Sequence, residues 1–351
     1  MEDEINIAFG TKILLKLSNQ LLEKKYTSIF VLVDTNTEKY CLPSFTSQMG
    51  LNQIKIMVMH AGEDYKNIKT CKKLWNQLSK LGGDRNSALI NLGGGVVTDL
   101  GGFVACTFKR GIDFYNVPTT LLAMVDASVG GKTGIDLGSL KNQIGIIEEP
   151  KQVIIDTQWL YTLPQEEIRS GFAEMLKHGL IQDASYWEIL KKINYLDPFL
   201  LSKYIKPSVA IKKKVVINDP KEKNLRKILN FGHTLGHAIE SYFLTHPKKK
   251  RLLHGEAIAI GMVLESYLGI HCCDFSSAAA QDIKNTFANH YPKVLFNLED
   301  RKGILKLLLH DKKNKAGITN FVLLKDIGAP QIDVEVPNDL FDKAFNFYDA
   351  P

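Results

Sequence analysis

Three histidines, an asparagine and a glutamate between positions 174 and 254 have the types and spacing of a metal and substrate site. Asn230, His233 and His237 are spaced at i, i+3 and i+7, which predicts that they lie along one face of a helix. His254 begins a further helix-like stretch, and Glu174 lies on an earlier one. Two imidazoles and a carboxylate from different helices are typical of catalytic zinc. The spacing alone also fits structural histidines, and the H-E-x-x-H motif of zincin proteases is absent.

A glycine turn in the first half of the chain could bind phosphate. Gly93, Gly94 and Gly95 follow an apolar run and precede a helix-like stretch, so backbone N–H groups and a helix N-terminus could face an anion. Thr98 stands where G-x-G-x-x-G has its third glycine, and glycine turns are often purely structural. The turn is therefore one candidate for a pyrophosphate site.

A second glycine-containing loop, residues 126–133, presents a lysine. It superficially resembles the P-loop, but Asp126 occupies the position where that motif needs its first glycine. The loop instead presents Lys132, and Lys141 with Asn142 follow shortly afterwards. This arrangement suits a phosphorylated or polyhydroxylated ligand better than it suits packing.

The elements that must position these residues change in character along the chain. Short apolar runs at 28–33, 54–59, 88–92, 114–117 and 153–155 predict a doubly wound, mainly parallel α/β sheet. Polar turns follow several of these strands, at the edge where open α/β sheets bind ligands. Longer amphipathic stretches at 165–180, 201–216, 229–243 and 255–270 predict an all-α C-terminal domain. We expect an α/β domain over 1–157 and a helical domain over 158–351.

Composition indicates an ordinary globular protein. The 351 residues suffice for about two domains, and the net charge of +6 is too small for a duplex-binding surface. The five cysteines are odd in number and form no C-x-x-C pair, which argues against a disulfide framework or a thiolate zinc site. Neither a signal-like segment at the acidic N-terminus nor an apolar run of membrane-spanning length is present. We expect a cytoplasmic protein that binds neither membrane nor nucleic acid.

Taken together, these motifs resemble the 3-dehydroquinate synthase family over nearly the whole chain. The matching stretches are 62–66, 93–99, 109–111, 118–123, 126–133, 141–145, 171–174, 229–237 and 253–256. The resemblance implies a homodimer with a Rossmann-like NAD-binding domain, a helical domain that binds metal and substrate, and an active site between the two.

Family roles fall on matching residues of this chain. The resemblance implies one zinc or cobalt ion per subunit, bound by Glu174, His233 and His254. The NAD site would consist of Asp34, Asn36, Glu63, Lys66, Gly94, Gly95, Val96, Val97, Thr98, Asp99, Thr119, Thr120, Lys132, Lys141, Trp159, Leu160, Tyr161 and Thr162. Substrate contacts and catalysis would fall to Asp126, Lys132, Asn142, Lys177, Lys212, Arg226, Asn230 and His237, with Arg110 and either Lys312 or Lys313 near the phosphate.

The reaction implied by the resemblance converts 3-deoxy-D-arabino-heptulosonate 7-phosphate into 3-dehydroquinate and phosphate, a step of the shikimate pathway. It combines transient oxidation by NAD, β-elimination of phosphate, re-reduction, ring opening and intramolecular aldol closure. The resemblance therefore implies a lyase, with a coenzyme that is regenerated in each cycle.

Three other functions remain open at this point. Sister cyclases that form 2-deoxy-scyllo-inosose or epi-valiolone share the scaffold, although Arg226, Asn230 and His237 together favour the dehydroquinate branch. A metal-dependent polyol dehydrogenase of the glycerol dehydrogenase type would have little need of Lys132, Asn142 and Arg226. A non-catalytic NAD or metal sensor has no evident use for Lys177 and His237.

Overall fold

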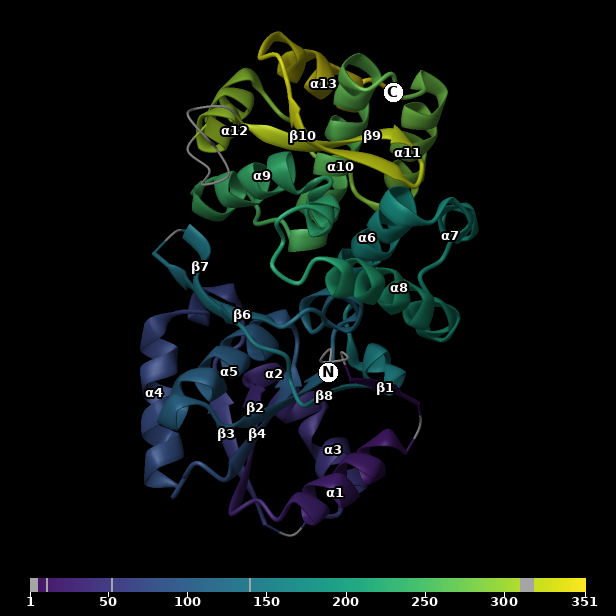
Figure 1. Ribbon diagram of the computed structural model, residues 1–351. Helices are drawn as coiled ribbons and strands as arrows, with labels where there is room; N and C mark the ends of the chain where they lie inside the picture. The colour runs from purple at the N-terminus through teal and green to yellow at the C-terminus, as the bar shows by residue number, and fades with distance from the viewer. Residues whose placement is uncertain (1–5, 11, 52, 139, 310–318) are drawn as a thin grey trace. The chain divides into compact units, whose positions relative to one another are not determined.

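The computed structural model describes residues 6–10, 12–51, 53–138, 140–309 and 319–351. The chain forms two compact units (Figure 1). The N-terminal unit comprises Met1–Pro164 with Pro198–Val209, and the C-terminal unit comprises Gln165–Asp197 with Ala210–Pro351. No helix within the described ranges combines the length and the apolar character needed to cross a membrane.

The N-terminal unit is built on a six-stranded parallel sheet with strand order β1-β8-β5-β4-β2-β3. The strands are β1 (Ile7–Phe9), β2 (Ser28–Asp34), β3 (Ile54–Met59), β4 (Ser87–Gly93), β5 (Asp113–Pro118) and β8 (Gln152–Ile155). The five apolar runs are thus five of its strands, each within one residue of the expected bounds. The prediction of a doubly wound parallel sheet is confirmed. The strand that was not expected, β1, has only three residues.

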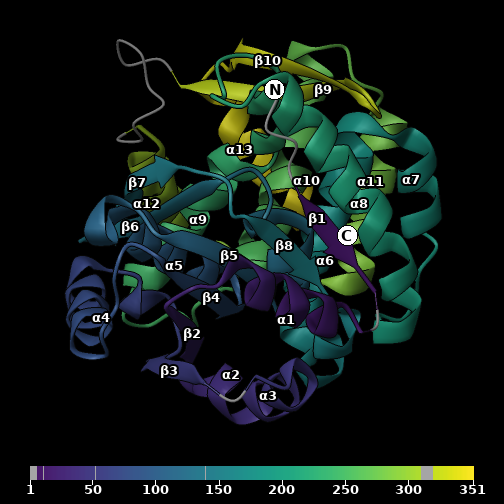
Figure 2. The same ribbon diagram turned by 60° about the horizontal axis from the view of Figure 1, so that its bottom comes forward.

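Helices cover both faces of this sheet, as Figure 2 shows for the N-terminal unit. They are α1 (Ile13–Lys24), α2 (Thr35–Tyr40), α3 (Leu42–Met49), α4 (Ile68–Lys80) and α5 (Gly95–Thr107). Because parallel crossovers are right-handed, the reversal of strand order between β3 and β4 puts α4 and α5 on the face opposite α1–α3. The apolar faces of α4 and α5 pack in one core with buried sheet residues such as Leu32, Leu89 and Phe114.

An antiparallel hairpin, β6 (Lys132–Leu137) and β7 (Leu140–Ile147), follows the glycine loop and was not expected from the sequence. Gly130 and Gly131 have φ angles of 104° and 64°, a region that glycine adopts without strain, and they bring the chain into β6. Lys132 is therefore the first residue of a strand rather than part of the loop.

The C-terminal unit is mainly helical. Its helices are α6 (Gln165–Gln182), α7 (Ala184–Leu190), the last part of α8 (Pro198–Asn218), η5 (Leu225–Asn230), α9 (His233–Thr245), α10 (His254–Cys272), α11 (Ser277–His290), α12 (Leu298–Leu309) and α13 (Asp339–Asp349). Helix α10 is apolar around most of its circumference because α6, α9, α11 and α13 all pack against it.

The expectation that this unit is all-α is wrong in one respect. Strands β9 (Asn320–Asp326) and β10 (Ala329–Glu335) form an antiparallel hairpin. Phe321 and Leu323 of β9 and Val334 of β10 are buried in the same core as α9, α10 and α13. The turn between the strands contains Gly328 with φ 83°, which only a glycine adopts easily. Residues of β10 alternate between exposed and more buried positions, so this strand lacks the continuous apolar run that marks a buried parallel strand.

The stretch 229–243 is also not a single helix. A short 3₁₀ helix ends at Asn230, and α9 begins at His233 after Gly232, whose φ is 77°. A side chain at Gly232 would overlap with Met262 of α10, so the residue allows a sharp bend against a neighbouring helix. Asn230 therefore does not share a helix face with His233 and His237, contrary to the prediction from spacing.

Close packing of α5 on the sheet predicts the effect of a mutation. Gly101 of α5 lies over Asn91 of β4, and a Cβ at this position would overlap with the Asn91 side-chain oxygen. Asn91 is buried and donates to the Asn116 side chain at 2.9 Å. We expect Gly101→Ala to destabilise the protein by about 1–3 kcal/mol through overpacking, despite the better helix propensity of alanine.

Chemical denaturation followed by circular dichroism measures this effect. Ser79→Ala, on an exposed position of α4, is the control and should change stability by less than about 0.5 kcal/mol. A Gly101→Ala variant as stable as the unaltered chain would contradict the packing described here.

Candidate functional site

Helix α6 carries a buried ion pair in the C-terminal unit. Glu174 and Lys177 are one turn apart, their side chains are 0% and 1% exposed, and Lys177 Nζ pairs with Glu174 Oε2. A buried carboxylate is costly unless it has charged or hydrogen-bonding partners. The second oxygen, Oε1, is buried and accepts no hydrogen bond from any described residue. That oxygen is therefore available to a cation.

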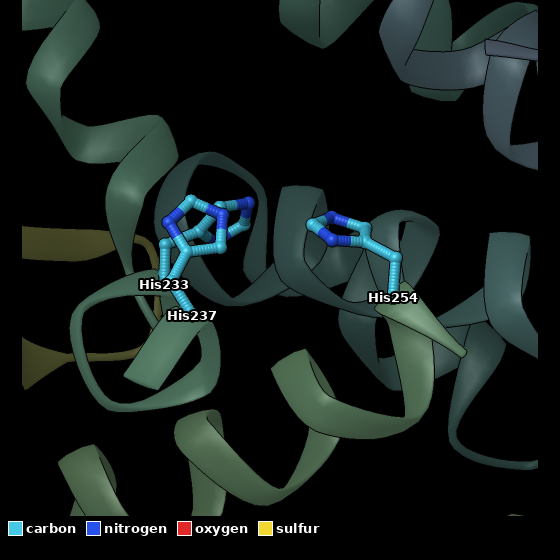
Figure 3. A group of neighbouring side chains, drawn as sticks. All are labelled: His233, His237 and His254. Atoms are coloured by element: carbon cyan, nitrogen blue, oxygen red, sulfur yellow. The ribbon is translucent and has the colours of Figure 1, made fainter. Parts of the chain in front are cut away.

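Three imidazoles gather near Glu174. His233 and His237 lie one turn apart on α9, and His254 is the first residue of α10. Figure 3 shows the rings of His233 and His237 rising from one helix toward the ring of His254 on the other. Ring centroids are 5.1 Å apart for His233 and His237, 5.6 Å for His233 and His254, and 5.8 Å for His237 and His254. One ring nitrogen from each lies within 4.8 Å of the others, so the group could hold a metal ion.

Hydrogen bonds set the direction of two of these rings. His233 Nδ1 donates to the Phe231 carbonyl at 3.1 Å, because a carbonyl oxygen only accepts. His254 Nδ1 lies 3.4 Å from Glu240 Oε2, which as a carboxylate oxygen likewise accepts. The opposite nitrogens, Nε2 of His233 and of His254, lie 3.6 and 3.9 Å from Glu174 Oε1.

These distances fit a bound metal ion. Ligand atoms around tetrahedral zinc lie about 2.0–2.2 Å from the ion and therefore about 3.4 Å from one another. Glu174 Oε1 lies 3.6 and 3.9 Å from the two imidazole nitrogens, close to that spacing, and imidazole with carboxylate is a ligand set that zinc accepts. His237 extends the group and could act as a further ligand or contact the substrate.

Backbone contacts between helices hold the donors in place. The N–H of Gly255 donates to Ser170 Oγ of α6 at 3.0 Å, and a Cβ at Gly255 would overlap with the Ser170 carbonyl. This contact holds the start of α10, where His254 lies, against Ser170 of α6. Ser170 precedes Glu174 by one helical turn. Glu265 of α10, fully buried, accepts from the N–H groups of Gly232 and Leu235 at 2.6 and 3.0 Å. It thus caps the first turn of α9, where His233 lies.

Three more of the expected substrate residues lie in the same unit. Lys212 of α8 and Arg226 of η5 are buried, and Arg226 Nη1 donates to the Pro220 carbonyl at 2.8 Å. Asn230 Nδ2 donates to Glu222 Oε1 at 2.8 Å. Glu222 was not expected from the sequence. Its backbone has φ 54°, so it lies in a strained bend that spacing does not reveal.

Five of the expected ligand-binding residues form a second cluster, in the N-terminal unit. Lys66 Nζ donates to Asp99 Oδ2 and to Asn142 Oδ1, both at 2.6 Å. Lys141 Nζ lies 3.6 Å from Glu63 Oε1. Burial lowers the pKa of Lys66, but the Asp99 and Glu63 carboxylates outweigh this effect and the net pKa is raised. Lys66 is therefore a buried ammonium group with two partners. Asp99 is an expected NAD residue, and Asn142 is an expected substrate contact.

The turns after β2, β4 and β5 lie at one edge of the sheet, where the sequence predicts a dinucleotide site. These strands are neighbours, so their carboxyl ends meet. Gly94 is the N-cap of α5, a Cβ there would lie 2.9 Å from Thr120 Cγ2, and the Thr119 N–H donates to the Gly93 carbonyl at 2.9 Å. Asp34 caps α2 by accepting from the backbone N–H groups of Asn36 and Thr37. Gly94 and Gly95 thus leave the backbone at the N-terminus of α5 without side chains, as the sequence predicts for a phosphate-binding turn.

Thr98 shows why this turn needs no third glycine. It is buried in the first turn of α5, where its hydroxyl donates to the Gly95 carbonyl at 3.1 Å. The hydroxyl is thus hydrogen-bonded to carbonyls of the glycine turn itself, those of Gly95 and Gly94. Val96, Val97 and Asp99 continue this first part of α5.

The remaining expected residues lie in short elements. Asp126 is part of the π-helical turn η3 (Ala123–Ala127), and Arg110 is exposed at the end of η2 (Phe108–Arg110). In η4 (Thr157–Thr162), Trp159 and Leu160 are buried whereas Tyr161 is 65% exposed, and Thr162 Oγ1 donates to the Trp159 carbonyl. Lys312 and Lys313 lie outside the described residues.

Comparisons with known proteins identify the family of this chain. Residues 56–170 match the model of the 3-dehydroquinate synthase N-terminal region, and residues 171–314 match that of the C-terminal region. A 3-dehydroquinate synthase of Parabacteroides distasonis is 42% identical over 335 residues, which cover 95% of this chain and 94% of the relative.

Solved structures of two cyclases have the same fold. A 2-deoxy-scyllo-inosose synthase, complexed with carbaglucose-6-phosphate, NAD+ and Co2+, has a TM-score of 0.86 at 26% identity and covers 97% of this chain and 95% of its own. A 2-epi-5-epi-valiolone synthase from Streptomyces hygroscopicus, with NAD+ and Zn2+ bound, has a TM-score of 0.83 at 23% identity and covers 99% and 97%. With both halves matched in order, and a relative of such identity along almost its entire length, the chain belongs to the 3-dehydroquinate synthase family.

Proposed function

We propose that this protein is a 3-dehydroquinate synthase, a carbon–oxygen lyase that converts 3-deoxy-D-arabino-heptulosonate 7-phosphate into 3-dehydroquinate and phosphate. The observation that carries the proposal is the convergence of His233 Nε2, His254 Nε2 and Glu174 Oε1. Identity of 42% to a 3-dehydroquinate synthase, against 26% to a 2-deoxy-scyllo-inosose synthase, favours this substrate over that of the sister cyclase.

Two cofactors follow from the same sites. Glu174, His233 and His254 would hold one zinc or cobalt ion, and the glycine turn at Gly94 and Gly95 with its neighbouring residues would hold NAD. The cyclase solved with NAD+ and Co2+ supports this pair of cofactors. When bound, the metal supplies Lewis acidity toward a substrate hydroxyl and NAD takes up and returns a hydride.

The chain's own residues would bind and orient a dianionic polyol. The substrate carries a carboxylate and a phosphate, and the expected contacts include the cations Lys132, Lys177, Lys212, Arg226 and Arg110. The buried side chains of Lys212 and Arg226 are suited to bind an anion because burial weakens screening by water. Asn230 and His237 offer hydrogen-bonding groups for hydroxyls, as do Asp126 and Asn142.

The proposal also includes a homodimer, a cytoplasmic location and two domains. Residues 1–157 would form the NAD-binding α/β domain, and residues 158–351 the helical metal- and substrate-binding domain. Support for the location is the set of five cysteines, all of which are free thiols. Support for the dimer is the exposed Arg110, a phosphate ligand by resemblance, which we propose acts in the partner's site.

Loss of a metal ligand tests the metal site. We expect Glu174→Ala and His233→Ala to weaken zinc binding by more than about 100-fold, because each removes one of three donors. Competition with a chromophoric chelator measures the affinity. Glu188→Ala, which removes an exposed carboxylate of α7 paired with Lys191, is the matched control and should bind zinc normally. Unchanged zinc affinity in the Glu174 variant would refute the site.

The role of NAD distinguishes the proposed lyase from a polyol dehydrogenase. The hydride resides on the coenzyme only between oxidation and re-reduction, so substoichiometric NAD should support many turnovers. The measurement follows phosphate release from the heptulosonate phosphate together with absorbance of NADH. We expect continued phosphate release without lasting NADH. One NADH accumulated per turnover would instead identify a dehydrogenase.

A mixed dimer tests whether Arg110 serves the partner's site. We expect Arg110→Ala and Glu174→Ala protomers to be inactive alone, and after dissociation and reassociation of a mixture about half of the dimers should be mixed. If the site is shared, each mixed dimer contains one intact site, so about a quarter of all sites should release phosphate. If Arg110 serves its own chain, no mixed dimer has an intact site, and absence of recovery with mixed dimers present would refute the sharing.

A further inference from the structure

A buried carboxylate on α9 lies behind one of the expected metal ligands. Glu240 is 6% exposed, and its Oε2 lies 3.4 Å from His254 Nδ1. It is spaced seven residues from His233 and three from His237, which places all three on the same side of α9. The helix that contributes His233 thus also contributes an acceptor for His254, which belongs to α10.

The hydrogen bond determines which nitrogen of His254 carries the proton. Neutral imidazole has one donor and one acceptor nitrogen, and a carboxylate only accepts. The proton therefore resides on Nδ1, toward Glu240, and the lone pair on Nε2, which lies 3.9 Å from Glu174 Oε1. The Phe231 carbonyl has the same effect on His233. Since only an unprotonated nitrogen can bind a metal, the second hydrogen bond prepares each ring for binding.

We propose that Glu240 is a positioning residue of the metal site, which holds His254 in the tautomer and orientation that direct its Nε2 lone pair toward Glu174. This inference rests on the proposed metal site. Glu240 itself lies on the far side of the imidazole and is not a ligand. Such outer carboxylates raise the basicity of the histidine and reduce the freedom of its ring, and their loss weakens metal binding by about 10–100-fold.

The experiment measures Zn2+ affinity of the full chain and the tautomer of His254. We expect Glu240→Ala to bind Zn2+ about 10–100-fold more weakly. In ¹⁵N-labelled, metal-free protein, two-bond nitrogen–proton correlations should show His254 as the Nδ1–H tautomer in the unaltered chain and as a mixture in Glu240→Ala. Glu240→Gln retains an oxygen that can accept from Nδ1, so it should restore the tautomer and most of the affinity.

A matched control separates positioning from general destabilisation. Ile304 of α12 is fully buried in the same hydrophobic core as Ile239, next to Glu240 in sequence. Ile304→Val should lower the unfolding midpoint but leave Zn2+ affinity and the His254 tautomer unchanged. A Glu240→Ala protein that stays folded and binds Zn2+ within threefold of the unaltered chain would overturn the inference, as would an unchanged tautomer.

Failure of the inference and failure of the proposed metal site are distinguishable. If Glu174→Ala and His233→Ala lose Zn2+ but Glu240→Ala does not, the metal site stands and the role of Glu240 is refuted. If none of the three variants loses Zn2+, the metal site itself is refuted, and the inference with it.

Discussion

Direct contact between the backbones of α6, α9 and α10 is the constraint on which the candidate metal site depends. A Cβ at Gly255 would overlap with the Ser170 carbonyl of α6, and a Cβ at Gly261 would overlap with the Gly232 carbonyl just before α9. Helices usually pack with axes 8–10 Å apart, and only small residues permit a closer approach. The side chains of Glu174, His233 and His254 can therefore meet although each comes from a different helix.

The same close packing forces polar groups into an apolar interior. Glu174 and Lys177 on α6 and Glu265 on α10 are all buried, and each has a charged or backbone partner. An apolar pair of similar volume would often be at least as stable as a buried ion pair. A stable core is normally apolar, and buried charged side chains depart from this rule. Proteins typically depart from it at functional sites. Lys66 with Asp99 is the equivalent in the N-terminal unit.

The sequence predicted most of the N-terminal sheet because a buried parallel strand leaves a local signal. The runs that became β2, β3, β4, β5 and β8 are short, apolar and followed by polar turns. Strand β1 was missed because three residues are too few to give a signal. The two hairpins pair strands that follow each other in the sequence, and they were missed because β7 and β10 are largely exposed and lack the apolar run of a buried parallel strand. The bend at Gly232 was missed for a different reason. It exists because Met262 approaches from another helix, which no periodicity within 229–243 can reveal.

Whether the hydrogen bonds of the site can be predicted from the sequence depends on how near in the chain the two partners lie. His233 receives its acceptor from Phe231, two residues before it, so its tautomer follows from the local turn into α9. His254 receives its acceptor from Glu240, fourteen residues earlier and on another helix. Spacing on α9 could have drawn attention to Glu240, since it follows His233 by seven residues and His237 by three. Its partner could not have been identified in the same way, because a helical repeat determines which side chains share a face and says nothing about what packs against that face.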